Sequence, residues 1–185
     1  MKNTYLTSHF PILSILLFSL SLSIAAEAHI SQWLDTIGIY SGMLEFFSET
    51  GIKLTFLFLL MLSFFMVFSA LKLIADTMME LSLLFFSNDV EGEVLRKVRG
   101  GSWIYLIGGL TSLLFITFPP GIAVVFAGGS FMYFIFFVYK VGDSMSGAGM
   151  FGMVMFHMSF WCVFILAVAY AAARLYNSFM ASLPI

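Results

Sequence analysis

The chain has 185 residues, of which 61% are hydrophobic and only 10% are charged, and its mean hydropathy is +1.04. This composition excludes a water-soluble globular fold and makes the lipid bilayer the expected environment. Eight basic and ten acidic residues leave a net charge of −2. So small a charge gives no general attraction to nucleic acid, and we expect no nucleic acid as a partner.

Five mostly apolar stretches divide the sequence into helix-sized segments. They lie near residues 10–28, 54–73, 102–118, 122–139 and 151–174. An α-helix rises about 1.5 Å per residue, so about 20 apolar residues cross the roughly 30 Å hydrocarbon core of a bilayer. The pattern predicts an all-α fold, a polytopic membrane bundle of about five transmembrane helices that forms a single domain over residues 1–185.

The first apolar stretch has two interpretations. Residues Pro11–Ala26 are apolar and rich in serine, and Ala26-Glu27-Ala28 fits the small-x-small pattern of a signal-peptidase site. The segment before it contains a single basic residue, Lys2, and the uncharged stretch is long enough to span a bilayer. We therefore expect a retained helix, and a cleaved signal peptide over residues 1–28 stays open as the alternative.

The basic residues are unevenly divided between the two sides of the predicted bundle. With the N-terminus in the cytoplasm, only Lys53 and Arg174 lie outside. The other six basic residues are then inside: Lys2, Lys72, Arg96, Lys97, Arg99 and Lys140. Cytoplasmic loops of membrane proteins are enriched in Lys and Arg. The sequence thus predicts a multi-pass protein of the cell membrane with its N-terminus inside and its C-terminus outside.

Residues 32–48, between the first two spans, show the periodicity of an amphipathic helix. The apolar positions recur at steps of three and four residues: Trp33, Ile37, Tyr40, Leu44 and Phe47. Asp35 and Glu45 lie off this stripe, as the polar face of such a helix requires. We expect one helix over 32–48 that lies in the outer headgroup plane and either caps the bundle or docks a partner.

Four ionisable residues within or beside the spans need an explanation, because such side chains are costly in a membrane. Lys72, Asp76 and Glu80 are spaced four residues apart and form one polar stripe on a helix. This stripe is either a self-paired helix face or an ion or proton site at the cytoplasmic mouth. His157 lies inside the fifth span, where it bonds to a backbone carbonyl or to Ser112, or else transfers protons near neutral pH.

The sequence lacks the short motifs of phosphate-binding loops, zinc proteases, serine hydrolases and CxxC redox sites. We therefore assign no catalytic, cofactor-binding or metal-binding residue, and we expect neither a cofactor nor an enzymatic activity. The single cysteine, Cys162, lies in the fifth span and is interpreted as a small apolar packing residue.

The opening residues Met-Lys-Asn-Thr-Tyr-Leu-Thr, the chain length and the layout of the apolar stretches resemble the YufK-type family of small uncharacterised Bacillus membrane proteins. The resemblance implies a bacterial cytoplasmic membrane and a five-span or similar layout. It implies no activity, and no functional residue follows from it.

Taken with the polar residues, this layout favours a small accessory or assembly subunit whose partner is a larger membrane complex. The alternative is a small transporter or channel component that uses His157 with Asp76 or Glu80. Flux into proteoliposomes that is lost in His157→Ala or Asp76→Asn variants would support the alternative. Co-purification with a specific larger complex would support the accessory function.

Overall fold

The structure, a computed structural model, describes residues 9–89 and 92–182. Its regular elements are helices, and no strand occurs in these ranges. The α-helices are α2 (Phe10–Thr36), α3 (Ile39–Leu44), α4 (Glu49–Phe86), α5 (Glu93–Arg99), α6 (Trp103–Ser112), α7 (Pro119–Val141) and α8 (Gly147–Ser182). The predicted all-α helical bundle is thereby confirmed.

Four helices of the described chain are long and apolar enough to cross a membrane. They are α2, α4, α7 together with the turn that follows it, and α8. With 38 residues in α4 and 36 in α8, each of these two helices is about 55 Å long at 1.5 Å per residue. Both therefore extend well beyond the roughly 30 Å hydrocarbon core of a bilayer.

The predicted span near 102–118 is shorter than expected. Its α-helical part, α6, has 10 residues and is flanked by 3-10 turns at Gly100–Ser102 and Leu113–Phe115. The chain then reverses at Phe118, since Pro119 and Pro120 lack amide donors and can only begin the next helix. The helices α6 and α7 consequently form a tight antiparallel hairpin.

The segment predicted as one amphipathic helix over 32–48 is not a single helix, and this prediction is wrong. Helix α2 continues without a break to Thr36, and α3 begins only at Ile39. Between them, Gly38 adopts a φ of 75° and donates its N–H to the carbonyl of Asp35 at 3.0 Å. This left-handed conformation favours glycine and ends a helix. The apolar residues keep their helical spacing on both sides of Gly38, so the sequence pattern gives no sign that the helix ends there.

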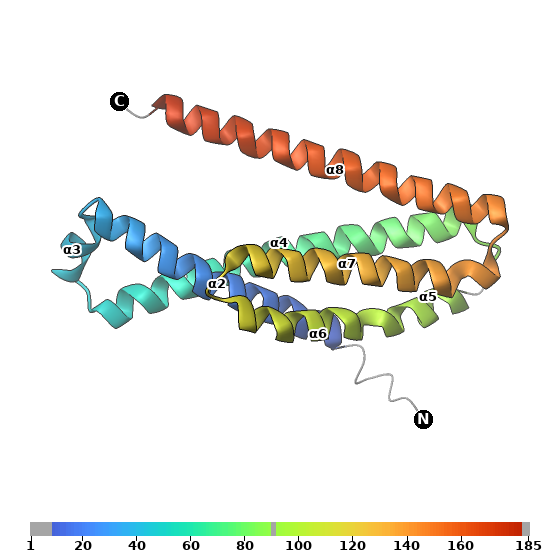
Figure 1. Cartoon of the computed structure of the whole chain (residues 1–185), viewed down its shortest axis with the longest axis horizontal. Helices are drawn as coiled ribbons and strands as arrows, with labels where there is room; N and C mark the ends of the chain where they lie inside the picture. Colours follow the sequence, from blue (N-terminus) through green and yellow to red (C-terminus); the bar gives the residue numbers. More distant parts are fainter. Residues whose placement is uncertain (1–8, 90–91, 183–185) are drawn as a thin grey trace.

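The helices α2, α4, α6 and α7 pack together, whereas α8 diverges from them toward its C-terminus (Figure 1). Two apolar clusters hold the bundle together. The first joins α2, α4 and α7 through the buried residues Phe18, Ala25, Phe68 and Ile122. The second lies near the end formed by α5 and the turn between α7 and α8, and contains the buried residues Met79, Val94, Val98, Phe137, Val141 and Met153.

Small residues bring α2 and α6 close together. The hydroxyl groups of the buried serines of α2 donate hydrogen bonds to backbone carbonyls one turn earlier, as Ser19 does to Ile15 at 2.7 Å. Ser21 also meets Ser112 of α6 with its hydroxyl oxygen at 2.7 Å. The adjacent Gly109 leaves room for α2 to approach. Small side chains and interhelical hydrogen bonds are the usual means by which membrane helices associate.

The orientation of the bundle stays a prediction, and the structure offers two exposed serines at opposite ends for testing it. Ser48 precedes α4 at the end that carries α3, and Ser146 lies in the turn between α7 and α8 (Figure 1). In a Cys162→Ser background, an impermeant thiol reagent added to intact cells should label Ser48→Cys and not Ser146→Cys. Permeabilised cells should show labelling of both. Labelling of Ser146→Cys alone in intact cells would show that the orientation is the opposite of the predicted one.

Candidate functional site

The charged stripe of α4 divides into two ion pairs. Lys72 donates to the carboxylate of Asp76 one turn later, and the two side chains are 35% and 40% exposed. Glu80 turns to another helix, where its Oε1 lies 3.6 Å from the guanidinium of Arg99 at the end of α5. Lys72 thus pairs with a residue of its own helix, whereas Glu80 pairs with a residue of α5.

Two tyrosines from the α6–α7 hairpin lie beside this stripe. The rings of Tyr105 and Tyr133 contact each other with a centroid separation of 5.4 Å. Tyr105 donates to the hydroxyl of Ser130 at 3.1 Å, and the hydroxyl of Tyr133 lies 3.8 Å from the sulfur of Met79. Met79 lies on α4, three residues after Asp76, so this contact brings the two tyrosines to the charged stripe. Side chains from α4, α6 and α7 therefore form one inner polar cluster.

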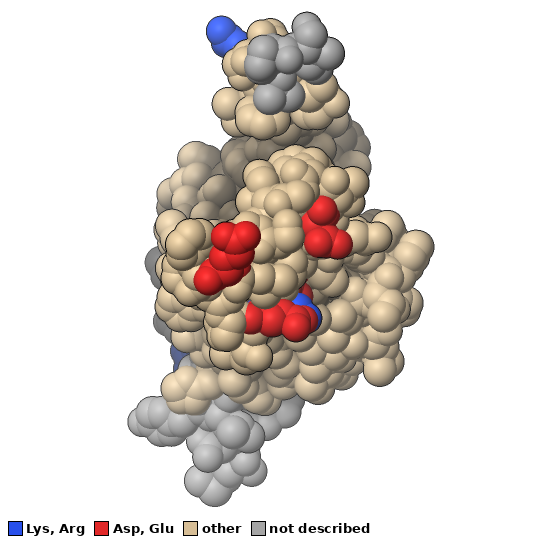
Figure 2. Space-filling model, turned by 90° about the vertical axis from the view of Figure 1, so that its left-hand side faces the viewer, with Lys and Arg blue, Asp and Glu red and all other residues tan. Residues whose placement is uncertain are grey.

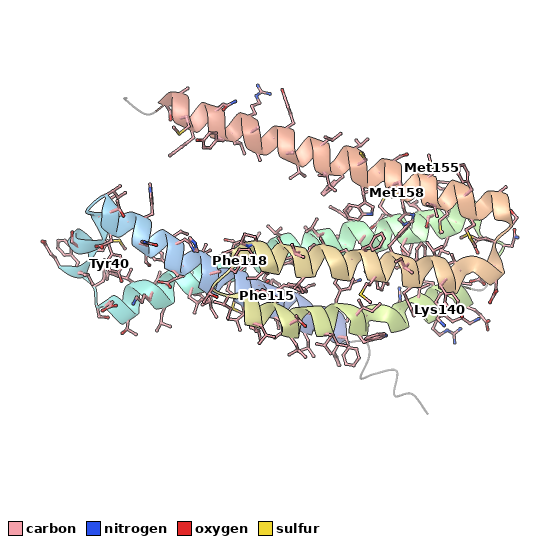
Figure 3. The ribbon with its side chains drawn as sticks, viewed as in Figure 1. Tyr40, Phe115, Phe118, Lys140, Met155 and Met158 are labelled. Carbon is pink, nitrogen blue, oxygen red and sulfur yellow. The ribbon has the colours of Figure 1, made fainter. Side chains whose placement is uncertain are left out.

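The depth of this cluster follows from the register of α4 and α7. Phe68 packs on Phe126 with ring centroids 5.1 Å apart. From that contact, Asp76 lies about 12 Å and Lys140 about 21 Å toward the inner end, at 1.5 Å per residue. Figure 3 shows Lys140 at the inner end of α7 and Phe118 at the opposite turn. The Lys72–Asp76 pair is accordingly level with the apolar part of α7, where charged groups persist only when compensated.

His157 lies apart from this cluster. It is buried, its Nδ1 lies 3.1 Å from the carbonyl oxygen of Met153, and its ring packs against Phe134 and Phe137 of α7. The other partner considered from the sequence, Ser112, bonds to Ser21 of α2 instead. A hydrogen bond to the preceding turn and contacts with aromatic rings are typical of a histidine that serves packing.

The structure does not bring the four candidate residues together. Over residues 9–89 and 92–182, no hydrogen bond or ion pair joins His157 to Asp76 or Glu80. In the same part of the chain, no group of three His, Cys, Asp or Glu side chains is close enough to hold a metal ion. A joint role of His157 with either carboxylate therefore stays a prediction.

A different feature, which the sequence did not indicate, is the outer half of α8, defined as Ile165–Ser182. Every residue in this range is exposed, whereas Met153 and His157 in the inner half are buried. Figure 1 shows this part of α8 standing away from the other helices. Arg174 lies on the outer half of α8 and forms no hydrogen bond or ion pair with the described residues.

Acidic side chains gather at the outer end of the molecule, which Figure 2 shows face on. We call this group the acidic outer cap; it consists of Glu27, Asp35, Glu45 and Glu49. Glu49 pairs with Lys53 at 2.6 Å, and Glu27 accepts a hydrogen bond from Ser31 at 2.8 Å. In the described chain no basic side chain pairs with Glu27, Asp35 or Glu45.

Comparison with known proteins places the chain among membrane proteins. A family model described as "Family of unknown function (DUF5366)" matches residues 27–184. The chain belongs to this family. A relative from Bacillus subtilis (strain 168), "Uncharacterized membrane protein YufK", is 46% identical over 185 residues, and the match covers 100% of both chains. No solved structure matches the chain.

These matches confirm the family that the opening residues and the layout of apolar stretches suggest. Together with the four long apolar helices, they establish that the protein is a multi-pass integral membrane protein.

Proposed function

We propose that the protein is a small accessory or assembly subunit of a larger membrane assembly, without enzymatic activity, and that it docks through the outer half of α8. The observation that carries this proposal is the exposure of Ile165–Ser182 on every face of the helix. A helix that completes a bundle buries one face, as the inner half of α8 does at Met153 and His157. The outer half leaves all its faces for contacts outside its own chain.

The composition of the outer half of α8 suits contact with another helix. Five of its six alanines are clustered, at positions 167, 169, 171, 172 and 173, and we call residues 167–173 the alanine segment. In lipid, helices associate through close van der Waals packing, which small side chains permit. Tyr170 lies within this segment, and Arg174 and Tyr176 follow it. Aromatic and basic residues of this kind anchor a helix near the membrane surface. The alanine segment would thus lie at a defined depth, where a partner helix could pack on it.

Photo-crosslinking in native membranes tests the proposal. A benzoylphenylalanine in place of Tyr170, which is 69% exposed, should form a covalent adduct with a protein partner after irradiation. The matched control is the same residue in place of Phe131, which is 65% exposed on α7 and should give only lipid adducts. If Tyr170 and Phe131 both give lipid adducts alone, the outer half of α8 faces lipid and docks nothing.

A further inference from the structure

Arg174 needs a counter-charge that its own chain does not supply in this structure. It lies on the outer half of α8, is exposed, and pairs with no described carboxylate. A guanidinium beside a bilayer is stabilised by pairing with an anion or by reaching water. An acidic group at the same depth would therefore favour one particular docking partner.

The acidic outer cap offers such groups in excess. With the predicted orientation, Lys53 and Arg174 are the basic residues on the outer side. Lys53 is already paired with Glu49, which leaves Glu27, Asp35 and Glu45 for any further cation. The charge of Arg174 thus complements a surface that every copy of this chain carries.

Helix register places Arg174 relative to the inner end of the bundle. The aromatic ring of Phe86 lies within 2.6 Å of where a Cβ on Gly152 would be, so α4 and α8 are level there. From this contact Arg174 lies about 33 Å toward the outer end at 1.5 Å per residue, or less where α8 is tilted.

The same reckoning places Glu27 close to the depth of Arg174. Phe68 lies about 27 Å outward from Phe86 along α4, and it contacts Phe18 of α2 with a centroid separation of 5.7 Å. Glu27 lies about 14 Å further along α2, hence about 40 Å from the inner contact, whereas Asp35 lies about 52 Å from it. Of these two carboxylates on α2, Glu27 is the one near the level of Arg174.

We infer that the outer half of α8 packs against a second copy of this chain, with Arg174 of each copy paired to Glu27 of the partner subunit. Copies inserted in the same orientation present these two residues at depths that differ by about 7 Å, which the long arginine side chain can span. A two-fold axis along the membrane normal then forms both pairs at once, as in isologous dimers. The inference rests on the proposed function, since it names the occupant of the same surface.

Thiol cross-linking between differently tagged chains tests the pairing. A short bismaleimide is used, because a disulfide requires Cα atoms within about 7 Å and the two residues already differ by about 7 Å in depth. One chain carries Glu27→Cys and the other Arg174→Cys, both in a Cys162→Ser background and co-expressed. The reagent should give a mixed cross-linked product of about twice the 20.7 kDa of one chain. Replacing Glu27→Cys by Glu49→Cys, which lies about 15 Å further out by helix rise, should give none.

A charge reversal provides a second measurement that does not depend on thiol geometry. Arg174→Glu should reduce the dimer fraction in lipid nanodiscs at least tenfold, and adding Glu27→Arg should restore it. Restoration also shows that a glutamate at position 174 is compatible with the folded chain. A dimer fraction unchanged by Arg174→Glu would overturn the inference.

The remaining outcomes separate this inference from the proposed function. If one chain with both Glu27→Cys and Arg174→Cys forms only an internal cross-link, α8 closes on its own bundle and the inference is wrong. If no mixed cross-link forms while the Tyr170 adduct contains a different protein, the second copy is excluded and the proposed function stands. If Tyr170 reaches only lipid, both are excluded.

Discussion

A variant that begins at His29 should fail to fold, because it lacks most of α2, which lies at the centre of the bundle. Within α2, Phe18 and Ala25 are buried against α4 and α7, at 2% exposure each. On the opposite partner, α6, Ser112 shares a hydrogen bond with Ser21. The truncation removes both Ser21 and Phe18. Ser112 would then lose its hydrogen-bond partner, and Phe68 would lose the ring on which it packs. In a membrane bundle these packing contacts are the main source of stability.

The expected consequence is that α2 is retained and that residues 1–28 are not a signal peptide. Intact mass of the protein purified from membranes should include this segment. The truncated variant should be degraded, or should show no cooperative thermal transition in detergent, while full-length protein shows one. A stable mature chain that begins near Ala28 would contradict this prediction and would favour the signal-peptide alternative.

The elements that could be predicted from the sequence are those with local causes. Long apolar stretches predict membrane helices without any tertiary information, because crossing a bilayer requires about 20 such residues. The ion pair between Lys72 and Asp76 could likewise be predicted from their spacing, since residues four apart on a helix lie side by side. Both conclusions depend on the helix itself and not on its neighbours.

Hydrophobic periodicity is insensitive to backbone conformation, which explains the error at residues 32–48. The apolar stripe continues in phase through Ile37 and Tyr40, yet Gly38 lies between them in the left-handed region. A glycine flanked by helical sequence has two outcomes, continuation or termination, and the pattern of side chains does not distinguish them. The Gly38 N–H bond to Asp35 shows that termination occurred.

The polar cluster could not be assembled from the sequence because its members meet through tertiary register. Tyr105 and Tyr133 each lie in an apolar stretch, and their contact depends on the position at which the α6–α7 hairpin reverses. Glu80 meets Arg99 only because α5 returns to α4 after the loop that follows Phe86. The exposure of the outer half of α8 could not be predicted from the sequence either, because an apolar helix has a similar composition whether it contacts lipid or protein.

The second large effect is expected at Gly109, where α2 packs closely against α6. A Cβ on Gly109 would lie 3.0 Å from the Cβ of Leu17 and 3.4 Å from the backbone oxygen of Ser14. Atoms this close to the backbone of α2 cannot move aside by rotating a side chain. Gly109→Leu should therefore force the two helices apart, and overpacking of this kind costs about 1–3 kcal/mol.

Gly128→Leu is the matched control for this effect. A Cβ on Gly128 meets no atom within 4 Å, and the residue lies within α7. The gain in helix propensity on replacing glycine is similar at both positions, so it cancels in the comparison. Unfolding by SDS in mixed micelles should show a lower midpoint for Gly109→Leu and a midpoint at or above that of the unmodified protein for Gly128→Leu. Equal midpoints for the two variants would mean that α2 and α6 are not packed as closely as their glycine and serine residues indicate.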